Sequence, residues 1–209
     1  MKRTALLAIA LLLGACQSQP HYTLQAPKEA FPTPPPPERV KGQTFHPTAG
    51  ARAPRNVSSA GPLKLAMVGD YMDAQEKDLR TILRGASIRR IGDDLILSVP
   101  DKGLFSGEGL SARGSAEMAQ VADLLRHYDQ SAIQIAGYMD TAKPESDALE
   151  ISSERARAVA DVLVADGVGA RRVTYQGYGS QHLRIATGPG QAEPRNRRIE
   201  MRIVARPQT

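Results

Sequence analysis

The sequence predicts an α/β (α+β) sandwich in which helices cover one face of a sheet, and three observations support this class. Apolar and polar residues alternate over several short segments, as they do in half-buried strands. In two longer segments the apolar residues recur every three or four positions, as in amphipathic helices. These segments follow one another as strand, helix, strand, helix, strand, strand, an order typical of helices packed on one side of a sheet.

The predicted domain, residues 63–209, starts with a helix and two strands. Residues 74–85 favour a short helix, and residues 87–99 favour two strands joined by a Gly-Asp turn. The second of these strands carries one apolar face, made of Leu95, Leu97 and Val99.

Two amphipathic helices are predicted farther along the chain. Residues 115–128 place their apolar side chains on one helical stripe, and Ser115 is the predicted N-cap. Residues 152–165 form a second stripe that is expected to face inward. The first stripe comprises Met118, Val121, Ala122 and Leu125, and the second comprises Val159, Val162 and Leu163.

Three more strands complete the predicted sheet. Residues 132–137 lie between the two predicted helices, and their apolar and polar side chains alternate as in a strand. Residues 171–179 and 197–205 follow the second helix and are the other two strands. The last strand places Ile199, Met201 and Ile203 on one face. We therefore expect one core, formed where the apolar strand faces meet the helix stripes.

The N-terminus has the pattern of an export signal. Lys2 and Arg3 precede an apolar run at residues 5–13, which as a helix would rise only about 14 Å, too short for a membrane core. We therefore expect residues 1–15 to be a signal peptide. The sequence Leu-Gly-Ala before Cys16 resembles the lipobox of bacterial lipoproteins, in which lipidation makes the Cys the first mature residue. The alternative is an ordinary secretory signal in which Cys16 is incidental.

Cys16 is the single cysteine of the chain, so no disulfide framework can form. Lipidation would explain this lone thiol, and Gln17 after it resembles lipoproteins destined for the outer membrane. Several acyl chains, each stabilised by about 0.8 kcal/mol per buried CH₂, would anchor the chain permanently. The sequence thus predicts a cell outer membrane lipoprotein whose domain lies in the periplasm.

Residues 16–62 favour a disordered tether. Ten of the fifteen prolines lie there, and no hydrophobic periodicity is present to offset the entropy of ordering. A proline-rich chain tends toward extended polyproline II, so this segment would reach on the order of 140 Å if fully extended. We expect it to connect the membrane anchor to the domain.

The charge balance argues against nucleic acid as a partner. Without Lys2 and Arg3, the 27 basic residues fall to 25 against 22 acidic ones, a net charge of +3. Eight arginines lie in residues 171–206. An exported, lipid-anchored chain rarely meets nucleic acid, so an acidic polymer or solubility explains this basic end better.

The sequence offers no catalytic or metal-ligating constellation. Of the four histidines, His21 and His46 fall in the tether, and no His pair or Cys cluster has metal-ligand spacing. No Gly-x-Ser-x-Gly segment predicts a nucleophile. We therefore expect no enzymatic activity, no metal and no cofactor.

Three motifs stand in order along the domain: Gly137-Tyr138-Met139-Asp140, residues 151–156 (Ile-Ser-Ser-Glu-Arg-Ala), and residues 196–200 (Asn-Arg-Arg-Ile-Glu). They resemble Gly-His-Thr-Asp, Leu-Ser-x-x-Arg-Ala and Asn-Arg-Arg-Val-Glu of the OmpA-like C-terminal domain, found in peptidoglycan-associated lipoproteins. The resemblance covers residues 70–204 and implies a β-α-β-α-β-β domain with helices on one face of a mixed sheet.

The resemblance also implies a peptidoglycan-binding site. In the family, the Asp of the first motif and the Arg of the second grip diaminopimelate in the stem peptide, and these positions are Asp140 and Arg155 here. Diaminopimelate offers an ammonium and a carboxylate on one carbon, so a fixed anion and a forked cation suit it. The open alternative is that Asp140 caps a helix or pairs directly with Arg155.

The predicted rim of this site departs from the family pattern. His and Thr of the family are replaced by apolar or bulkier side chains next to Asp140, and Ala148 and Glu193 stand where the family has other residues. We therefore expect weaker binding or a changed stem-peptide preference rather than loss of binding. The predicted rim residues are Phe105, Ser106, Tyr138, Met139 and Thr141.

The predicted function is non-covalent peptidoglycan binding that links the outer membrane to the cell wall. The alternative is an accessory lipoprotein that anchors an envelope, secretion or motility assembly, mainly through contacts with other envelope proteins. OmpA-like domains are appended to such assemblies, and the basic residues 195–206 could dock a partner, although a charge run is usually a solvated face.

Overall fold

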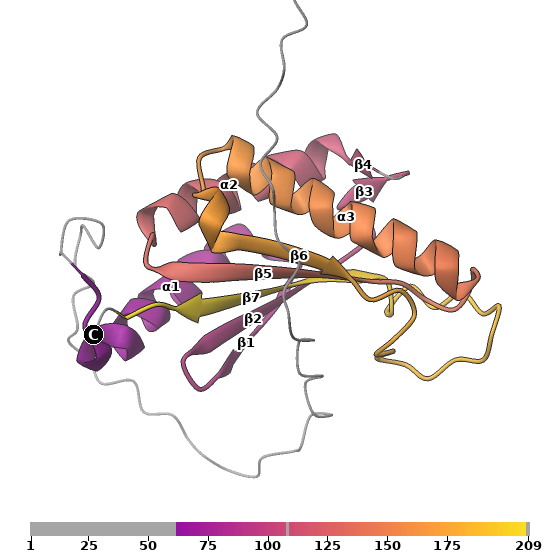
Figure 1. The fold of residues 1–209 in the computed structure, drawn as a ribbon, viewed down its shortest axis with the longest axis horizontal. Coiled ribbons are helices and arrows are strands. Elements are labelled where there is room, and N and C mark those ends of the chain that lie inside the picture. The colour runs from indigo at the N-terminus through magenta and orange to yellow at the C-terminus, as the bar shows by residue number, and fades with distance from the viewer. Residues whose placement is uncertain (1–61, 108, 208–209) are drawn as a thin grey trace, which may run out of the picture.

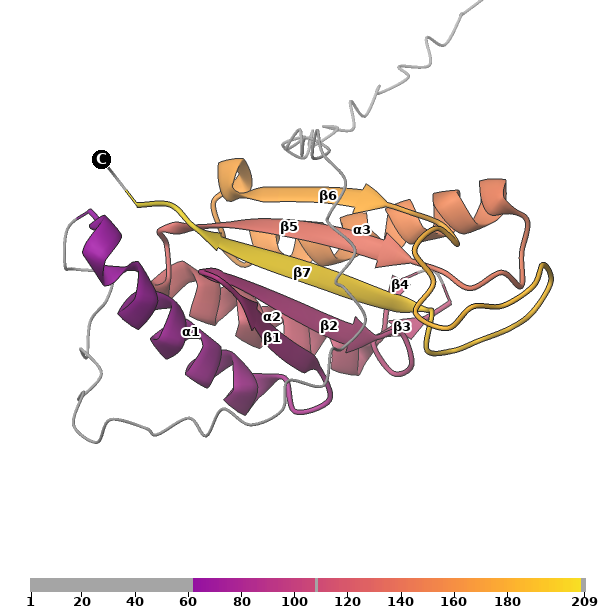
Figure 2. The ribbon, with the colours of Figure 1, turned by 90° about the horizontal axis from the view of Figure 1, so that it is seen from below.

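A mixed sheet covered on one face by helices forms the fold (Figures 1 and 2). The computed structural model describes residues 62–107 and 109–207. The predicted signal peptide, the lipidated Cys16 and nearly all of the predicted tether lie outside these residues. Within the described residues the sheet has five strands in the order β1-β2-β7-β5-β6, so the last strand of the chain lies at its centre.

The strand pairing confirms the mixed sheet. Neighbouring strands run antiparallel except β5 and β6, which are parallel because α3 crosses over between them. The strands are β1 (Ser87–Ile91), β2 (Asp94–Pro100), β5 (Ser131–Tyr138), β6 (Val173–Gly177) and β7 (Arg198–Ala205). A separate hairpin of β3 (Phe105–Ser106) and β4 (Gly109–Leu110), which the sequence did not predict, follows β2.

The helices have the predicted type but begin earlier than expected. They are α1 (Val68–Ile82), α2 (Ala112–His127) and α3 (Glu145–Ala165), with short 3-10 turns at Leu65–Met67 and Ala170–Arg172. The α1 stripe starts at the buried Val68, six residues before the predicted start, and continues through Leu79. Ser111, not Ser115, is the N-cap of α2, because its hydroxyl accepts a hydrogen bond from Gly114 N–H at 2.9 Å.

The core lies between the helix stripes and one sheet face, as predicted. All of the predicted inward strand residues are buried, and Val162 of α3 is half-buried at the margin. Figure 1 shows α2 and α3 lying over this face of the sheet. The fully buried members include Leu95, Leu97, Met118, Val121, Leu125, Val159, Leu163, Met201 and Ile203.

Two glycines let α3 lie directly against the ends of β5 and β6. A Cβ on Gly137 would stand 2.1 Å from the Ser152 carbonyl oxygen, and one on Gly177 would stand 2.4 Å from Ser153 N. No larger residue fits there without moving backbone. This close approach brings the segment after β5 and the middle of α3 to the same end of the sheet.

Candidate functional site

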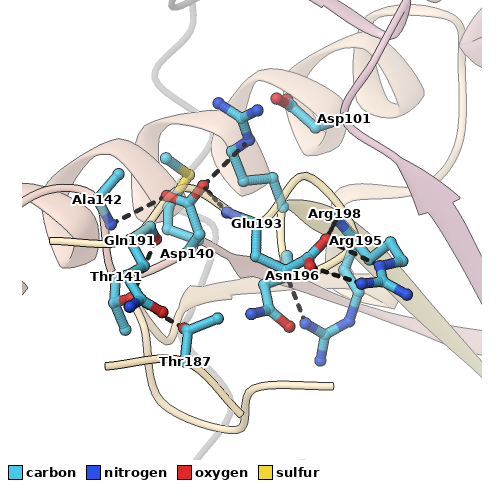
Figure 3. A network of polar contacts seen from close by, with 12 residues as sticks. Asp101, Asp140, Thr141, Ala142, Thr187, Gln191, Glu193, Arg195, Asn196 and Arg198 are labelled. Carbon is cyan, nitrogen blue, oxygen red and sulfur yellow. Dashed lines mark hydrogen bonds and ion pairs between the residues drawn. The ribbon is translucent and has the colours of Figure 1, made fainter. Parts of the chain in front are cut away.

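Asp140 is a buried carboxylate held by backbone donors. It lies two residues past the end of β5 and is 2% exposed. Its Oδ2 accepts the Glu193 N–H at 3.0 Å, and its Oδ1 accepts the Ala142 N–H at 3.4 Å (Figure 3). Arg197 Nε lies 3.5 Å from Oδ2. The carboxylate therefore has a fixed position that does not depend on any single side chain.

Arg155 projects from α3 and is surrounded by protein groups. Its Nη1 lies 2.9 Å from Asp101 Oδ1 and donates to Met139 Sδ at 3.3 Å. Its Nη2 donates to the Gly107 carbonyl at 3.2 Å, and the guanidinium carbon stands 5.0 Å from the centre of the Phe105 ring. The cation is thus held by the segment after β2, the β3–β4 hairpin and the residue before Asp140.

Asp140 and Arg155 come to one end of the sheet but do not neutralise each other. Within the described residues no ion pair of 4.0 Å or less joins them, and Asp140 is near Arg197 while Arg155 is near Asp101. Nor does Asp140 cap α3, whose N-cap is Pro144 without a side-chain hydrogen bond. Both alternatives, a helix cap and a direct pair, are therefore wrong.

The five predicted rim residues occupy different environments. Phe105 lies against Arg155, while Ser106 is exposed on the same hairpin. Met139 is buried and contacts Arg155, and its N–H donates to the Gly179 carbonyl at 2.7 Å. Thr141 Oγ1 donates to the Gly188 carbonyl at 2.7 Å and lies 2.9 Å from Thr187 Oγ1. Their role at a binding rim stays a prediction.

Tyr138 belongs to a second polar cluster. It is buried, stacks on Tyr178 with ring centres 5.3 Å apart, and lies 3.9 Å beneath the Arg198 guanidinium. Arg198 Nε donates to Glu200 Oε1 at 2.8 Å, and Arg184 Nη2 donates to the same oxygen at 2.9 Å. Burial, followed by the charge of Glu200, raises the pKa of Tyr138, and burial lowers the pKa of Arg198.

The long segment between β6 and β7 is fastened by Asn196. Its side chain accepts the backbone N–H groups of Arg184 and Ile185 at 2.8 and 2.9 Å and donates to the Ile185 carbonyl at 2.8 Å. Near its end, Arg195 Nη2 donates to Glu193 Oε2 at 2.7 Å, and this pairing lowers the pKa of the partly exposed Glu193 carboxyl to about 2. The fastened segment presents the Glu193 N–H to Asp140 (Figure 3).

Sequence reasoning missed three groups of this site. Arg197 lies in the Asn-Arg-Arg motif, so the motif could have suggested it. The Glu193 N–H and the Asp101 carboxylate carry no local sequence signal, because Asp101 and Arg155 are far apart in the chain and meet only in the fold.

Two further findings apply to the part of the chain that the structure describes. There, no cluster of three or more His, Cys, Asp or Glu side chains could hold a metal ion. No described helix combines the length and the apolar character needed to span a membrane.

Comparisons with known proteins relate the sequence of this chain to one family and to several proteins. Residues 105–197 match the OmpA family. Probable lipoprotein YiaD of Escherichia coli (strain K12) is 34% identical over 140 residues, which are 65% of this chain and 64% of that protein. The peptidoglycan-binding protein ArfA of Mycobacterium tuberculosis (strain ATCC 25618 / H37Rv) is 33% identical over 82 residues, 39% of this chain and 25% of that protein.

The fold is also shared with a solved structure. A putative MotB-like protein from Desulfovibrio vulgaris superposes with a TM-score of 0.56 at 21% identity, covering 67% of this chain and 99% of that one. The chain spans under two thirds of the curated relatives named above. The match concerns the domain that carries Asp140 and Arg155.

Proposed function

We propose that Asp140 and Arg155, which lie within the residues that match the OmpA family, bind the diaminopimelate of peptidoglycan stem peptides without chemical turnover. The observation that carries the proposal is a buried carboxylate and a guanidinium at the same end of the sheet that are not paired with each other. A zwitterionic ligand needs two such opposite charges, held apart and in fixed positions.

The two charges differ in how they would act. Asp140 is fixed by the Glu193 and Ala142 N–H groups, so it can accept from a ligand ammonium without first being ordered. Arg155 has the planar guanidinium that can give a ligand carboxylate two parallel N–H bonds, and its Nη1 and Nη2 now contact Asp101 and the Gly107 carbonyl. ArfA, which is named a peptidoglycan-binding protein, supports peptidoglycan as the ligand.

With the predicted lipid anchor, this binding would link the outer membrane mechanically to the cell wall. In the proposal, acyl chains on Cys16 hold the chain in the outer membrane, and residues 16–62 present the domain to the wall from the periplasmic side. YiaD, which is named a probable lipoprotein, supports the lipid anchor. Metabolic labelling with palmitate tests it: the label should appear in the wild type and be absent from Cys16→Ser.

Co-sedimentation with purified sacculi tests the binding. The full chain in mild detergent is mixed with diaminopimelate-type sacculi beside Asp140→Asn and Arg155→Ala, with circular dichroism to confirm folding. The wild type should pellet and both variants should remain in the supernatant. A folded wild type that stays in the supernatant would contradict the proposal and direct the search to partners among envelope proteins.

A further inference from the structure

Asp101 stands at the centre of an unusual pairing within the site. Its backbone is fixed, because its N–H donates to the Arg197 carbonyl at 3.1 Å and its carbonyl accepts the Leu104 and Phe105 N–H groups at 3.0 and 3.2 Å. Its carboxylate lies 2.9 Å from Arg155 Nη1. The side chains of Asp101 and Arg155 are 17% and 15% exposed, so water screens this attraction only partly.

The two charges are close but poorly aligned. Asp101 Oδ1 is buried and accepts no hydrogen bond within the described part of the chain, and the buried Arg155 Nε donates none there. By contrast, Asp94 receives two aligned bonds from Arg202, from Nε at 2.8 Å and from Nη2 at 2.5 Å. Asp101 therefore supplies charge to Arg155 without completing its hydrogen bonding.

The small cavity that this pair lines cannot hold a ligand. The cavity, lined by Asp101, Phe105, Arg155, Gly137 and Ile199 among others, is too narrow for a water molecule. The remaining guanidinium face lies against the Phe105 ring, and Nη2 bonds Gly107. A ligand carboxylate that takes Arg155 Nη1 as one of two parallel donors must therefore move the Asp101 carboxylate aside.

We propose that Asp101 is an internal counter-ion that competes with the ligand carboxylate for Arg155 and so sets the affinity of the site. This inference rests on the proposed function. The Asp101 side chain can rotate away while its backbone stays fixed, and the ligand gains the aligned bonds that Asp101 does not form. Asp140 has no such competitor role, because backbone N–H groups hold its carboxylate.

The test compares Asp101→Asn with a matched control, Asp94→Asn. Both changes remove one negative charge from an Asp–Arg pair, and the two Asp side chains are 17% and 18% exposed. Asp94 starts β2 whereas Asp101 follows its end, so only Asp101 lies at the site. Competition predicts that Asp101→Asn binds diaminopimelate-type sacculi about fivefold more tightly than the wild type, while Asp94→Asn matches it.

A second measurement tests the competition for Arg155 without peptidoglycan. The Arg155 Nε–Hε signal, assigned by its loss in Arg155→Lys, is followed by NMR during titration with sodium acetate at constant ionic strength. Asp101→Asn should shift this signal at about fivefold lower acetate than the wild type. The full chain in detergent serves for both measurements, and circular dichroism checks folding.

The outcomes separate the two proposals. If Asp101→Asn gains acetate affinity but no variant binds sacculi, the counter-ion role stands and the proposed function falls. If the wild type binds sacculi and Asp101→Asn gains affinity in neither assay, or binds more weakly, the counter-ion role is overturned and the proposed function stands. An equal gain in Asp94→Asn also overturns it, since net charge would then explain the effect.

Discussion

Two neighbouring arginines, Arg197 and Arg198, lie in surroundings of opposite character. Arg198 is 5% exposed, donates to Glu200 and to two carbonyl oxygens, and covers the Tyr138 ring. The Arg197 side chain is 35% exposed and makes one ion pair, 3.5 Å from Asp140. One short motif therefore supplies a cation whose donors are used inside the fold and a cation that remains accessible beside the site.

The difference shows that two adjacent arginines can contribute very differently to stability. A buried ion pair with its hydrogen bonds satisfied fixes the fold, because removing either member leaves a desolvated charge. A partly exposed cation with one long contact adds little to stability and can turn toward a ligand. The first prediction below tests this distinction directly.

The largest effect on stability is expected from Arg198→Ala. It leaves Glu200, 3% exposed, with Arg184 alone and removes the group stacked on Tyr138, so the free energy of unfolding should fall by about 3 kcal/mol. Arg197→Ala is the adjacent control and should cost less than about 1 kcal/mol. Urea denaturation followed by circular dichroism measures both. Equal losses in the two variants would remove the distinction.

Gly137→Ala should destabilise the fold and disturb the site together. Its Cβ would meet the Ser152 carbonyl at 2.1 Å, so β5 and α3 must separate, at a cost of about 2–3 kcal/mol. Since β5 leads to Asp140 and α3 carries Arg155, sacculus binding per folded molecule should also fall. Gly69→Ala is the control, because nothing lies within 4 Å of its Cβ. Unchanged stability and binding in Gly137→Ala would contradict the close approach.

The smallest expected effect is the contribution of the Glu193 carboxyl to the pH dependence of stability. Hydrogen bonds from Arg195 lower its folded pKa to about 2, below the ordinary 4.5, so the folded state favours the ionised carboxylate. Its contribution is fully present above pH 4.5 and disappears as the pH falls through about 2. An NMR carboxyl titration should find the low midpoint in the wild type and one near 4.5 in Arg195→Ala. A wild-type midpoint near 4.5 would show that Arg195 does not hold this carboxyl.

Much of the fold could be predicted from local patterns. Alternation placed Leu95, Leu97 and Val99 in the core, because one face of each strand meets the helices. The first residues of the helices were harder to predict. The α3 helix begins at Glu145, where acidic side chains follow Pro144 and apolar periodicity is weak, so the stripe became visible only near residue 152.

The site could be predicted only in part. The motifs indicated Asp140 and Arg155, and the fold brings them to one end of the sheet. The partners of these two charges could not be read from the sequence, since Asp101, Gly107 and Glu193 meet them through tertiary packing. The hairpin that carries Phe105 has strands of only two residues, too short for a periodic signal.

The central claim is that Asp140 and Arg155 together recognise the two charges on one carbon of diaminopimelate. The most direct measurement is calorimetric titration of the detergent-solubilised full chain with two soluble muropeptides that differ only in having diaminopimelate or lysine at the third position. Lysine lacks the second carboxylate, so the wild type should prefer diaminopimelate by at least about tenfold, and Arg155→Ala should lose this preference. Equal affinity of the wild type for both muropeptides would contradict the account.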